Sequence, residues 1–166
     1  NVYQTAQIGN QLWMAENLRV TTYRDGSEIP GPPSDADWVN LSTGAWTNYA
    51  GGDDDTYAYL YNWYAVDDSR GLAPEGWHIP TDEEWTELFD YLGESVGGKM
   101  KEEGTEHWCG GNPCINEGAT NVSGFTALPG GYRGNSGTCI GQGHIGSFWS
   151  SSDDGSNAWY SQLYYD

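Results

Sequence analysis

The sequence predicts an α+β fold of short antiparallel strands and one or two helices, joined by long ordered loops. Three features of the chain support this class: a hairpin pattern near the start, a capped helix in the middle, and short β-like segments between glycines in the last third. At 166 residues the chain is long enough for its own core, and no internal repeat or low-complexity linker divides it. We therefore expect a single domain over residues 1–166.

The first half is predicted to be poor in regular structure. Residues 2–7 and 11–15 flank Gly9-Asn10, a dipeptide that favours a tight turn, so a β-hairpin is expected there. Residues 23–55 are dense in Gly, Pro, Asp, Ser and Asn, which predicts a long ordered loop held by buried aromatic rings. Residues 57–66 are apolar and aromatic, and we expect a strand leading into a short helix.

A helix of about three turns is predicted after Thr81. Thr81 and Glu84 have the spacing of a capping box, in which each side chain bonds the backbone N–H of the other residue. The residues that follow form one apolar stripe at helical spacing: Trp85, Leu88, Phe89 and Leu92. A second short helix is expected within residues 95–103, weakened by two glycines.

In the last third, glycines recur between short β-like segments, which predicts several strands joined by exposed loops. Residues 158–165 alternate between two faces of one strand. One face would carry Ala158, Tyr160, Gln162 and Tyr164. The other would be partly buried and carry Trp159, Ser161, Leu163 and Tyr165.

Several blocks of the sequence resemble a known family. They are residues 8–18 (IGNQLWMAENL), 76–85 (GWHIPTDEEW) and 124–133 (GFTALPGGYR), followed by FWSSS at 148–152 and AWY at 158–160. In this order they are similar to the Fibrobacter succinogenes major paralogous domain. The resemblance implies an extracellular module of a bacterial surface protein with a C-type-lectin-like fold, related to the formylglycine-generating-enzyme group. It also implies one more C-terminal strand, which this chain would lack.

The composition excludes some partners. The chain has 24 Asp and Glu against 6 Lys and Arg, a formal charge of -18, which repels nucleic-acid phosphates. Such acidity is explained either by cation sites or by solvation outside a cell. No segment approaches the ~20 apolar residues of a membrane span, so no membrane insertion is expected. We expect a soluble protein, extracellular or at the cell surface, whose signal peptide has been removed.

The cysteines are expected to include one local disulfide. Cys109 and Cys114 flank a Gly-Gly-Asn-Pro turn that can bring their sulfurs together, as suits an oxidising compartment. Cys139 is left over. It either stands free or, as the resemblance implies, pairs with a cysteine in a following segment.

Residues for catalysis are few. The histidines are His78, His107 and His144, and no nucleophile elbow, metalloprotease helix or phosphate loop is present. A structural hydrogen-bonding role is expected for His78, and no catalysis for the chain. The resemblance leaves one alternative, a copper-dependent oxidase of the formylglycine-generating type. That enzyme binds copper through two cysteines with the spacing of Cys109 and Cys114, but after the glycine-rich block, whereas this pair precedes it.

A structural calcium ion is a possible cofactor, because carboxylates and carbonyls are its preferred ligands. The best candidates are Asp53, Asp54 and Asp55, and the alternative is a solvated acidic turn. We expect no other cofactor.

The predicted function is ligand binding by the C-terminal third. The candidate binding residues are Tyr132, Arg133, Asn135, His144, Ser152, Asp153, Asp154, Asn157, Trp159 and Tyr160. Aromatic rings beside amides, carboxylates and hydroxyls suit either a carbohydrate or a protein ligand outside the cell, as in an adhesin or receptor. For Arg133 the alternative is a structural carboxylate partner. A purely structural domain of a surface assembly is the third possible function.

The resemblance adds a further expectation, diversification by a retroelement that randomises surface residues through adenine-directed mutagenesis. The stretch 132–165 is similar to such targets, and an ordinary polar loop region is the alternative. The positions reachable from an asparagine codon are Asn135, Ser136, Thr138, Cys139, Ile140, His144, Asp153, Asp154, Gly155, Ser156, Asn157 and Tyr160.

Overall fold

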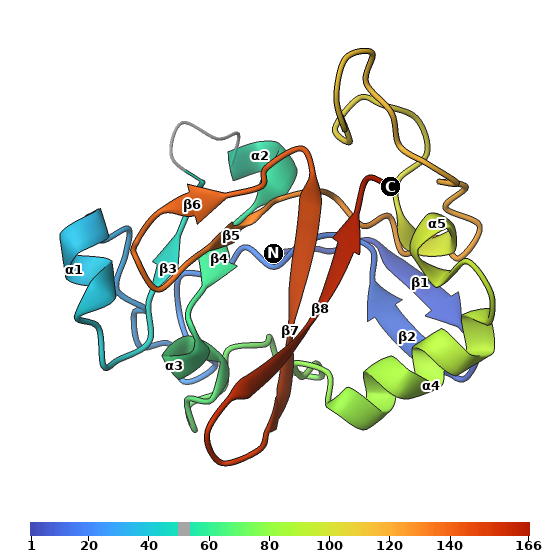
Figure 1. Cartoon of the computed structure of the whole chain (residues 1–166). Helices are drawn as coiled ribbons and strands as arrows, with labels where there is room; N and C mark the ends of the chain where they lie inside the picture. The colour runs from blue at the N-terminus through green and yellow to red at the C-terminus, as the bar shows by residue number, and fades with distance from the viewer. Residues whose placement is uncertain (50–53) are drawn as a thin grey trace.

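Short antiparallel strand pairs and a few helices make up the chain (Figure 1), as the predicted α+β class requires. The structure is a computed structural model that describes residues 1–49 and 54–166. Four strand pairs are described: β1 (Thr5–Ile8) with β2 (Gln11–Met14), β3 (Trp46–Thr47) with β4 (Leu60–Tyr61), β5 (Tyr132–Arg133) with β6 (Cys139–Ile140), and β7 (Ile145–Asp153) with β8 (Ala158–Tyr164). The helices are α1 (Asp35–Val39), α2 (Asp54–Tyr57), α3 (Trp63–Val66), α4 (Asp82–Leu92) and α5 (Val96–Met100).

The N-terminal hairpin is confirmed. Ile8 of β1 pairs with Gln11 of β2, and Gly9 takes the positive φ of 59° that the tight turn requires. Ile8 and Trp13 turn inward from the two strands and are buried.

The capping box of α4 is also confirmed. The Thr81 hydroxyl accepts a hydrogen bond from the Glu84 N–H at 3.2 Å, and the Glu84 carboxylate accepts one from the Thr81 N–H at 2.8 Å. The helix ends at Gly93, whose φ is 66°. Of the predicted apolar stripe, Trp85, Leu88 and Leu92 are buried and Phe89 is partly buried.

The core consists of two clusters. The first centres on aromatic rings, with Trp85 4.8 Å from Trp13, 6.0 Å from Phe125 and 6.0 Å from Phe148 between ring centroids. It joins the hairpin, α4 and β7. The second gathers under α3 and contains Tyr23, Ile29, Ala65, Val66 and Leu72.

Trp149 of β7 connects the two clusters. Its backbone carbonyl accepts a hydrogen bond from the Trp85 indole N–H at 3.3 Å, at the edge of the first cluster. Its own indole packs against the second cluster and donates to the Tyr61 carbonyl at 2.7 Å. The position of β7 between the two halves of the molecule is fixed by these contacts.

Residues 23–55 contain three elements or parts of elements that the loop prediction missed: α1, β3 and the start of α2. α1 has only five residues and buries none of them, so it has no apolar stripe for the sequence to reveal. Ser34 caps it by accepting from the Asp37 N–H. The strand and short helix predicted within 57–66 correspond to β4 and α3, and the second short helix within 95–103 corresponds to α5.

The last third forms strands and loops as predicted. β7 and β8 make a twisted ribbon that runs down the centre of Figure 1, with their turn at its lower end. Gly146 of β7 also bridges Gly131 beside β5, so the two ribbons of this region lie side by side.

All six cationic side chains are held by groups of the chain itself. Lys101 is 1% exposed and donates to three backbone carbonyls, those of Glu117 at 3.0 Å, Tyr164 at 2.8 Å and Tyr165 at 3.1 Å. Burial lowers its pKa. Lys101 thereby attaches the end of β8 to the body of the protein.

Replacing Thr81 with alanine should lower the free energy of unfolding by about 1 kcal/mol, because the cap of the core helix α4 is lost. Urea denaturation measures this change. The matched control is Ser34→Ala, which removes the same kind of cap from α1. Since α1 buries no residue, its loss should be clearly smaller, and equal losses would contradict the role given to α4.

Replacing Lys101 with methionine should cost about 2–4 kcal/mol, because three partly buried hydrogen bonds from its charged ammonium group to backbone carbonyls are lost. The control is Lys99→Met, since Lys99 is half-buried and donates to one carbonyl, that of Leu92. The control should cost less than about 1 kcal/mol in the same denaturation experiment. A Lys101→Met protein as stable as the wild type would show that these carbonyls do not depend on the lysine.

Candidate functional site

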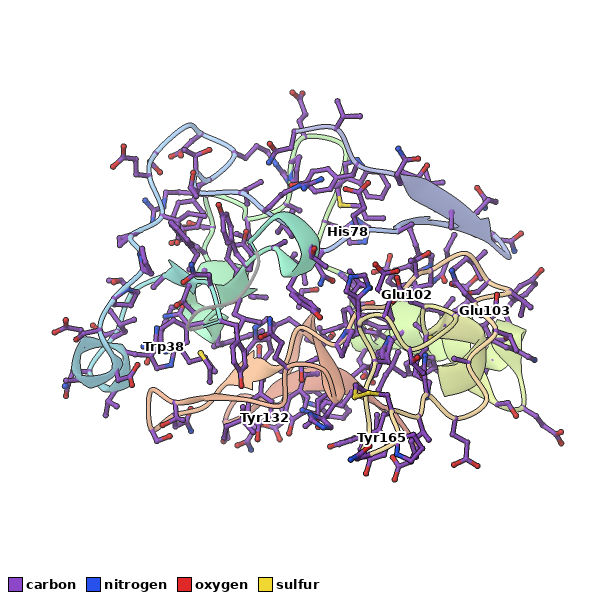
Figure 2. All side chains as sticks on the ribbon, turned by 90° about the horizontal axis from the view of Figure 1, so that it is seen from above. Trp38, His78, Glu102, Glu103, Tyr132 and Tyr165 are labelled. Atoms are coloured by element: carbon purple, nitrogen blue, oxygen red, sulfur yellow. A yellow bond between two sulfur atoms is a disulfide. The ribbon has the colours of Figure 1, made fainter. Side chains whose placement is uncertain are left out.

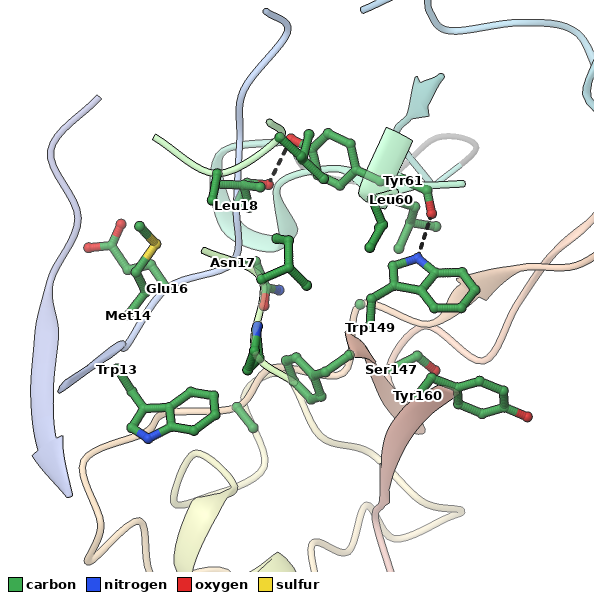
Figure 3. A pocket seen from close by; sticks show the side chains of 18 of the residues that line it. Trp13, Met14, Glu16, Asn17, Leu18, Leu60, Tyr61, Ser147, Trp149 and Tyr160 are labelled. Atoms are coloured by element: carbon green, nitrogen blue, oxygen red, sulfur yellow. Dashed lines mark hydrogen bonds between the residues drawn. The ribbon is translucent and has the colours of Figure 1, made fainter. Parts of the chain in front are cut away.

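A cleft of about 830 Å³ lies between the N-terminal segment and the β7–β8 ribbon. Its walls come from residues within 10–18, 57–66, 72–85 and 125–135 and from the strand segments 147–149 and 160–162 (Figure 3). Such a volume is within the range of small-ligand sites. The cleft lies where the two core clusters meet, because Trp85 of the first and Leu72 of the second both line it.

One wall is a face of the β7–β8 ribbon. Trp149 is paired with Tyr160 across the strands, and Ser147 with Gln162. The Trp149 and Tyr160 rings meet edge to face with centroids 6.1 Å apart, and the Gln162 amide donates to the Ser147 hydroxyl at 2.9 Å. Tyr160 is 59% exposed at the rim (Figure 3). This wall therefore alternates aromatic rings with small polar groups.

The opposite wall is built by residues after β2. The Asn17 amide donates to the Tyr57 carbonyl at 3.1 Å, which attaches this segment to the loop before β4. The Tyr61 hydroxyl donates to the Val20 carbonyl at 2.9 Å and accepts from the Val20 N–H at 2.8 Å. Burial raises the pKa of Tyr61 well above its ordinary value, so this hydroxyl stays neutral. The wall is held by hydrogen bonds between segments about 40 residues apart in sequence.

The charged groups of the lining are paired within the chain. Glu16 bonds Arg19 at 2.7 Å. Glu84 bonds His78 at 2.8 Å in addition to its cap, the structural hydrogen bond expected for this histidine. Partial burial raises the pKa of Glu84, but the Thr81 N–H and His78 outweigh it and hold the pKa below its usual value.

Arg133 is bound in place by the chain. Its guanidinium makes four hydrogen bonds, with Gly137, Pro33, Thr47 and Asp35, the last an ion pair of 2.7 Å. Its side chain is 4% exposed and lies over the Trp38 ring. Arg133 therefore has a structural carboxylate partner, Asp35, which is the alternative that the sequence left open for this side chain.

The structure does not bring the predicted binding residues together on one face. Tyr132, Arg133, Asn135 and Tyr160 line the cleft. His144 is exposed where β7 begins, with its ring against Tyr165. It is not among the residues that line the cleft.

Around the β7–β8 turn the predicted residues serve the turn itself. Asp153 and Asp154 accept hydrogen bonds from backbone N–H groups of the turn, including that of Asn157 at 2.7 Å, and these bonds lower the pKa of Asp154. The Ser152 hydroxyl accepts from the N–H of Asp82 and so attaches β7 to the start of α4. These turn residues do not line the cleft, because the ribbon is long enough to separate its turn from it.

Trp159 and Tyr160 lie on opposite faces of β8. Trp159 is 45% exposed and does not line the cleft, whereas Tyr160 does. The period-two alternation of a strand causes this separation.

Several lining residues were missed as site residues by the sequence prediction, above all Asn17, Tyr61 and Trp149. The first and last lie in sequence blocks on which the family resemblance rests. No local pattern places them together, since 88 residues separate Tyr61 from Trp149. Only the folded chain shows that they form one site.

The predicted disulfide is present between Cys109 and Cys114 (Figure 2, near Tyr165). It joins to each other the two sulfurs that the copper-oxidase alternative requires as ligands. Cys139 is a free, half-buried thiol in β6.

For the predicted calcium site, Asp53 and the side chains of Asp54 and Asp55 lie outside the described residues. Asp54 opens α2. Elsewhere in the described chain no group of three or more His, Cys, Asp and Glu side chains is placed to hold a metal ion. Among the described helices, none has the length and apolar character needed to cross a bilayer.

The fold and the cleft define a small α+β domain with an aromatic-walled cleft. Residues 6–165 match the model of the Fibrobacter succinogenes major domain, nearly the whole chain. The chain therefore belongs to this bacterial domain family, as the sequence blocks indicated. Comparison with curated proteins and with solved structures finds no match.

Thiol titration checks the cysteine assignment. Denatured but unreduced protein should give one reactive thiol, from Cys139, and reduced protein should give three. Three thiols before reduction would contradict the disulfide and favour a pair of cysteines free to bind copper.

Proposed function

We propose that this domain is an extracellular ligand-binding module of a bacterial surface protein, an adhesin or receptor-like domain, and that its ligand occupies the cleft between the N-terminal segment and the β7–β8 ribbon. The observation that carries the proposal is the cleft itself. It is large, aromatic and partly apolar, with a few polar groups converging on it, which is the usual composition of a binding site. Compared with the sequence prediction, the proposed site is no longer the C-terminal third alone, because residues within 10–18, 57–66 and 72–85 also line the cleft.

The chemistry of the lining favours binding over catalysis. The acidic and basic side chains in the cleft, Glu16, Glu84 and Arg133, already have partners in the chain. A general base or nucleophile needs an activated group within reach of a substrate. His78 is the remaining titratable candidate with a ring nitrogen in the lining, and its Nε2 is engaged by Glu84.

Diversification by a retroelement is part of the proposal for the C-terminal region. Eleven of the twelve positions named above are exposed, and the twelfth, Cys139, is half-buried. Exposed positions tolerate substitution with little loss of stability. Two of them, Asn135 and Tyr160, line the cleft, so variation there would alter the ligand directly.

A structural calcium ion at Asp53, Asp54 and Asp55 remains part of the proposal, with carboxylate oxygens as its ligands. Residues 57–61, which follow closely, line the cleft. An ion held there would lie close in sequence to one wall of the proposed site.

A fragment screen by NMR tests the location of the site without assuming the ligand. Fragments that bind ¹⁵N-labelled protein should shift the Trp149 indole resonance, and Tyr160→Ala should weaken them because part of the aromatic rim is lost. The matched control is Trp159→Ala, which removes a neighbouring exposed ring from the other face of β8. The control should leave fragment affinities within about twofold.

Both variants should keep the wild-type fold, because both rings are exposed. The proposal fails if fragments shift resonances scattered over the surface, or if Trp159→Ala weakens them as much as Tyr160→Ala does.

A further inference from the structure

The protein as a whole is strongly acidic, whereas the charged side chains that line the cleft are paired with other groups of the chain. This difference restricts the charge of a ligand that can bind there. The chain carries a formal charge of -18, which repels anions over a distance of about 10 Å at moderate ionic strength. Inside the cleft, however, Glu16 and Glu84 are paired with Arg19 and His78, and Arg133 with Asp35. An anionic ligand would be repelled on approach, and a cationic ligand would have to compete for carboxylates that already have partners.

The polar groups left for a ligand are uncharged. Within the described residues, six polar lining side chains make no hydrogen bond to the rest of the chain: Asn10, Tyr59, Trp77, Tyr132, Asn135 and Tyr160. Amides and phenolic hydroxyls each both donate and accept hydrogen bonds. Their natural complement is a ligand whose own groups both donate and accept, as neighbouring sugar hydroxyls do.

Aromatic rings lie beside these groups. Trp149 and Tyr160 form an edge-to-face pair on the ribbon wall, and Tyr132 stands on the neighbouring β5. The face of an aromatic ring carries partial negative charge, which attracts the weakly positive C–H groups on one face of a pyranose ring. Rings for the C–H face and amides for the hydroxyl edge are therefore present in the same cleft.

The size of the cleft favours more than one sugar unit. Its volume of about 830 Å³ is toward the upper end of the range for small-ligand sites, and it is open along the Tyr160 rim. An open end allows a chain of sugars to continue beyond the site.

From these observations we infer that the cleft binds a neutral oligosaccharide, through stacking on Tyr160 and Tyr132 and hydrogen bonds from the uncharged amides and hydroxyls of its lining. The inference rests on the proposed function, since it names the ligand class of that same cleft. A peptide is the competing ligand, because the same residue types also bind proteins. The paired charges favour the sugar. A peptide that binds so acidic a protein would be expected to be cationic and to pair with free carboxylates, but Glu16 and Glu84 of the cleft already have partners.

The test is calorimetric titration, with calcium present throughout, against hexasaccharides of glucose, galactose, mannose and xylose and against the anionic hexagalacturonate. At least one neutral hexasaccharide should bind, and hexagalacturonate should bind at least about tenfold more weakly because of the protein's charge. Tyr160→Ala and Tyr132→Ala should each weaken binding about tenfold. Trp159→Ala should change it by less than about twofold.

Selection of a phage-displayed peptide library on the same protein distinguishes a failure of the carbohydrate inference from a failure of the proposed binding function. The carbohydrate inference is overturned if no neutral hexasaccharide binds, or if hexagalacturonate binds equally well. If selected peptides then bind the wild type but not Tyr160→Ala, the cleft is still the ligand-binding site. If neither sugars nor peptides depend on Tyr160 or Tyr132, the proposed function falls with the carbohydrate inference. Near-ultraviolet circular dichroism confirms that each variant is folded.

Discussion

The position of Trp149, fixed through both its backbone carbonyl and its indole, is the constraint on which the rest of this structure depends. Most of the strands are only two to four residues long, so hydrogen-bonded sheets contribute little continuity between the halves of the molecule. Trp149 supplies that continuity in both directions, by accepting from Trp85 and donating to Tyr61. A buried indole N–H that lacks a partner is costly, which makes this position of β7 strongly preferred.

The same arrangement explains why a cleft exists. The two clusters meet beside this space, which Trp85 of the first and Leu72 of the second both line. The walls of that space are aromatic because rings packed in the two clusters, among them Trp85 and Trp149, border it, and their indole N–H groups reach backbone carbonyls. All nine tryptophans lie in the described chain, and all except Trp159 are buried or half-buried. Most of the tryptophans therefore pack in or against the core, and some of these core rings, such as Trp85 and Trp149, also line the cleft.

The features predictable from the sequence were those set by neighbouring residues. The hairpin at Gly9-Asn10 and the capping box of Thr81 and Glu84 are local patterns, and both formed as predicted. α1 was missed because a five-residue helix that buries none of its residues leaves no periodic signal. The cleft could not be predicted, since its walls meet through contacts such as Trp149 with Tyr61 that connect distant parts of the chain. The alternation along residues 158–165 did place Trp159 and Tyr160 on opposite faces, yet composition alone had grouped them into one binding surface.

The most direct test of this account is native-state hydrogen exchange of a Trp149→Phe protein, which removes the indole N–H and retains an aromatic ring. If Trp149 couples the two clusters, protection should fall together for the amides of Leu88 in α4 and of Val66 in α3, which belong to different clusters. A loss of protection confined to Val66 and its neighbours, with Leu88 unchanged, would show that the clusters are stabilised independently and would contradict the central role given to this residue.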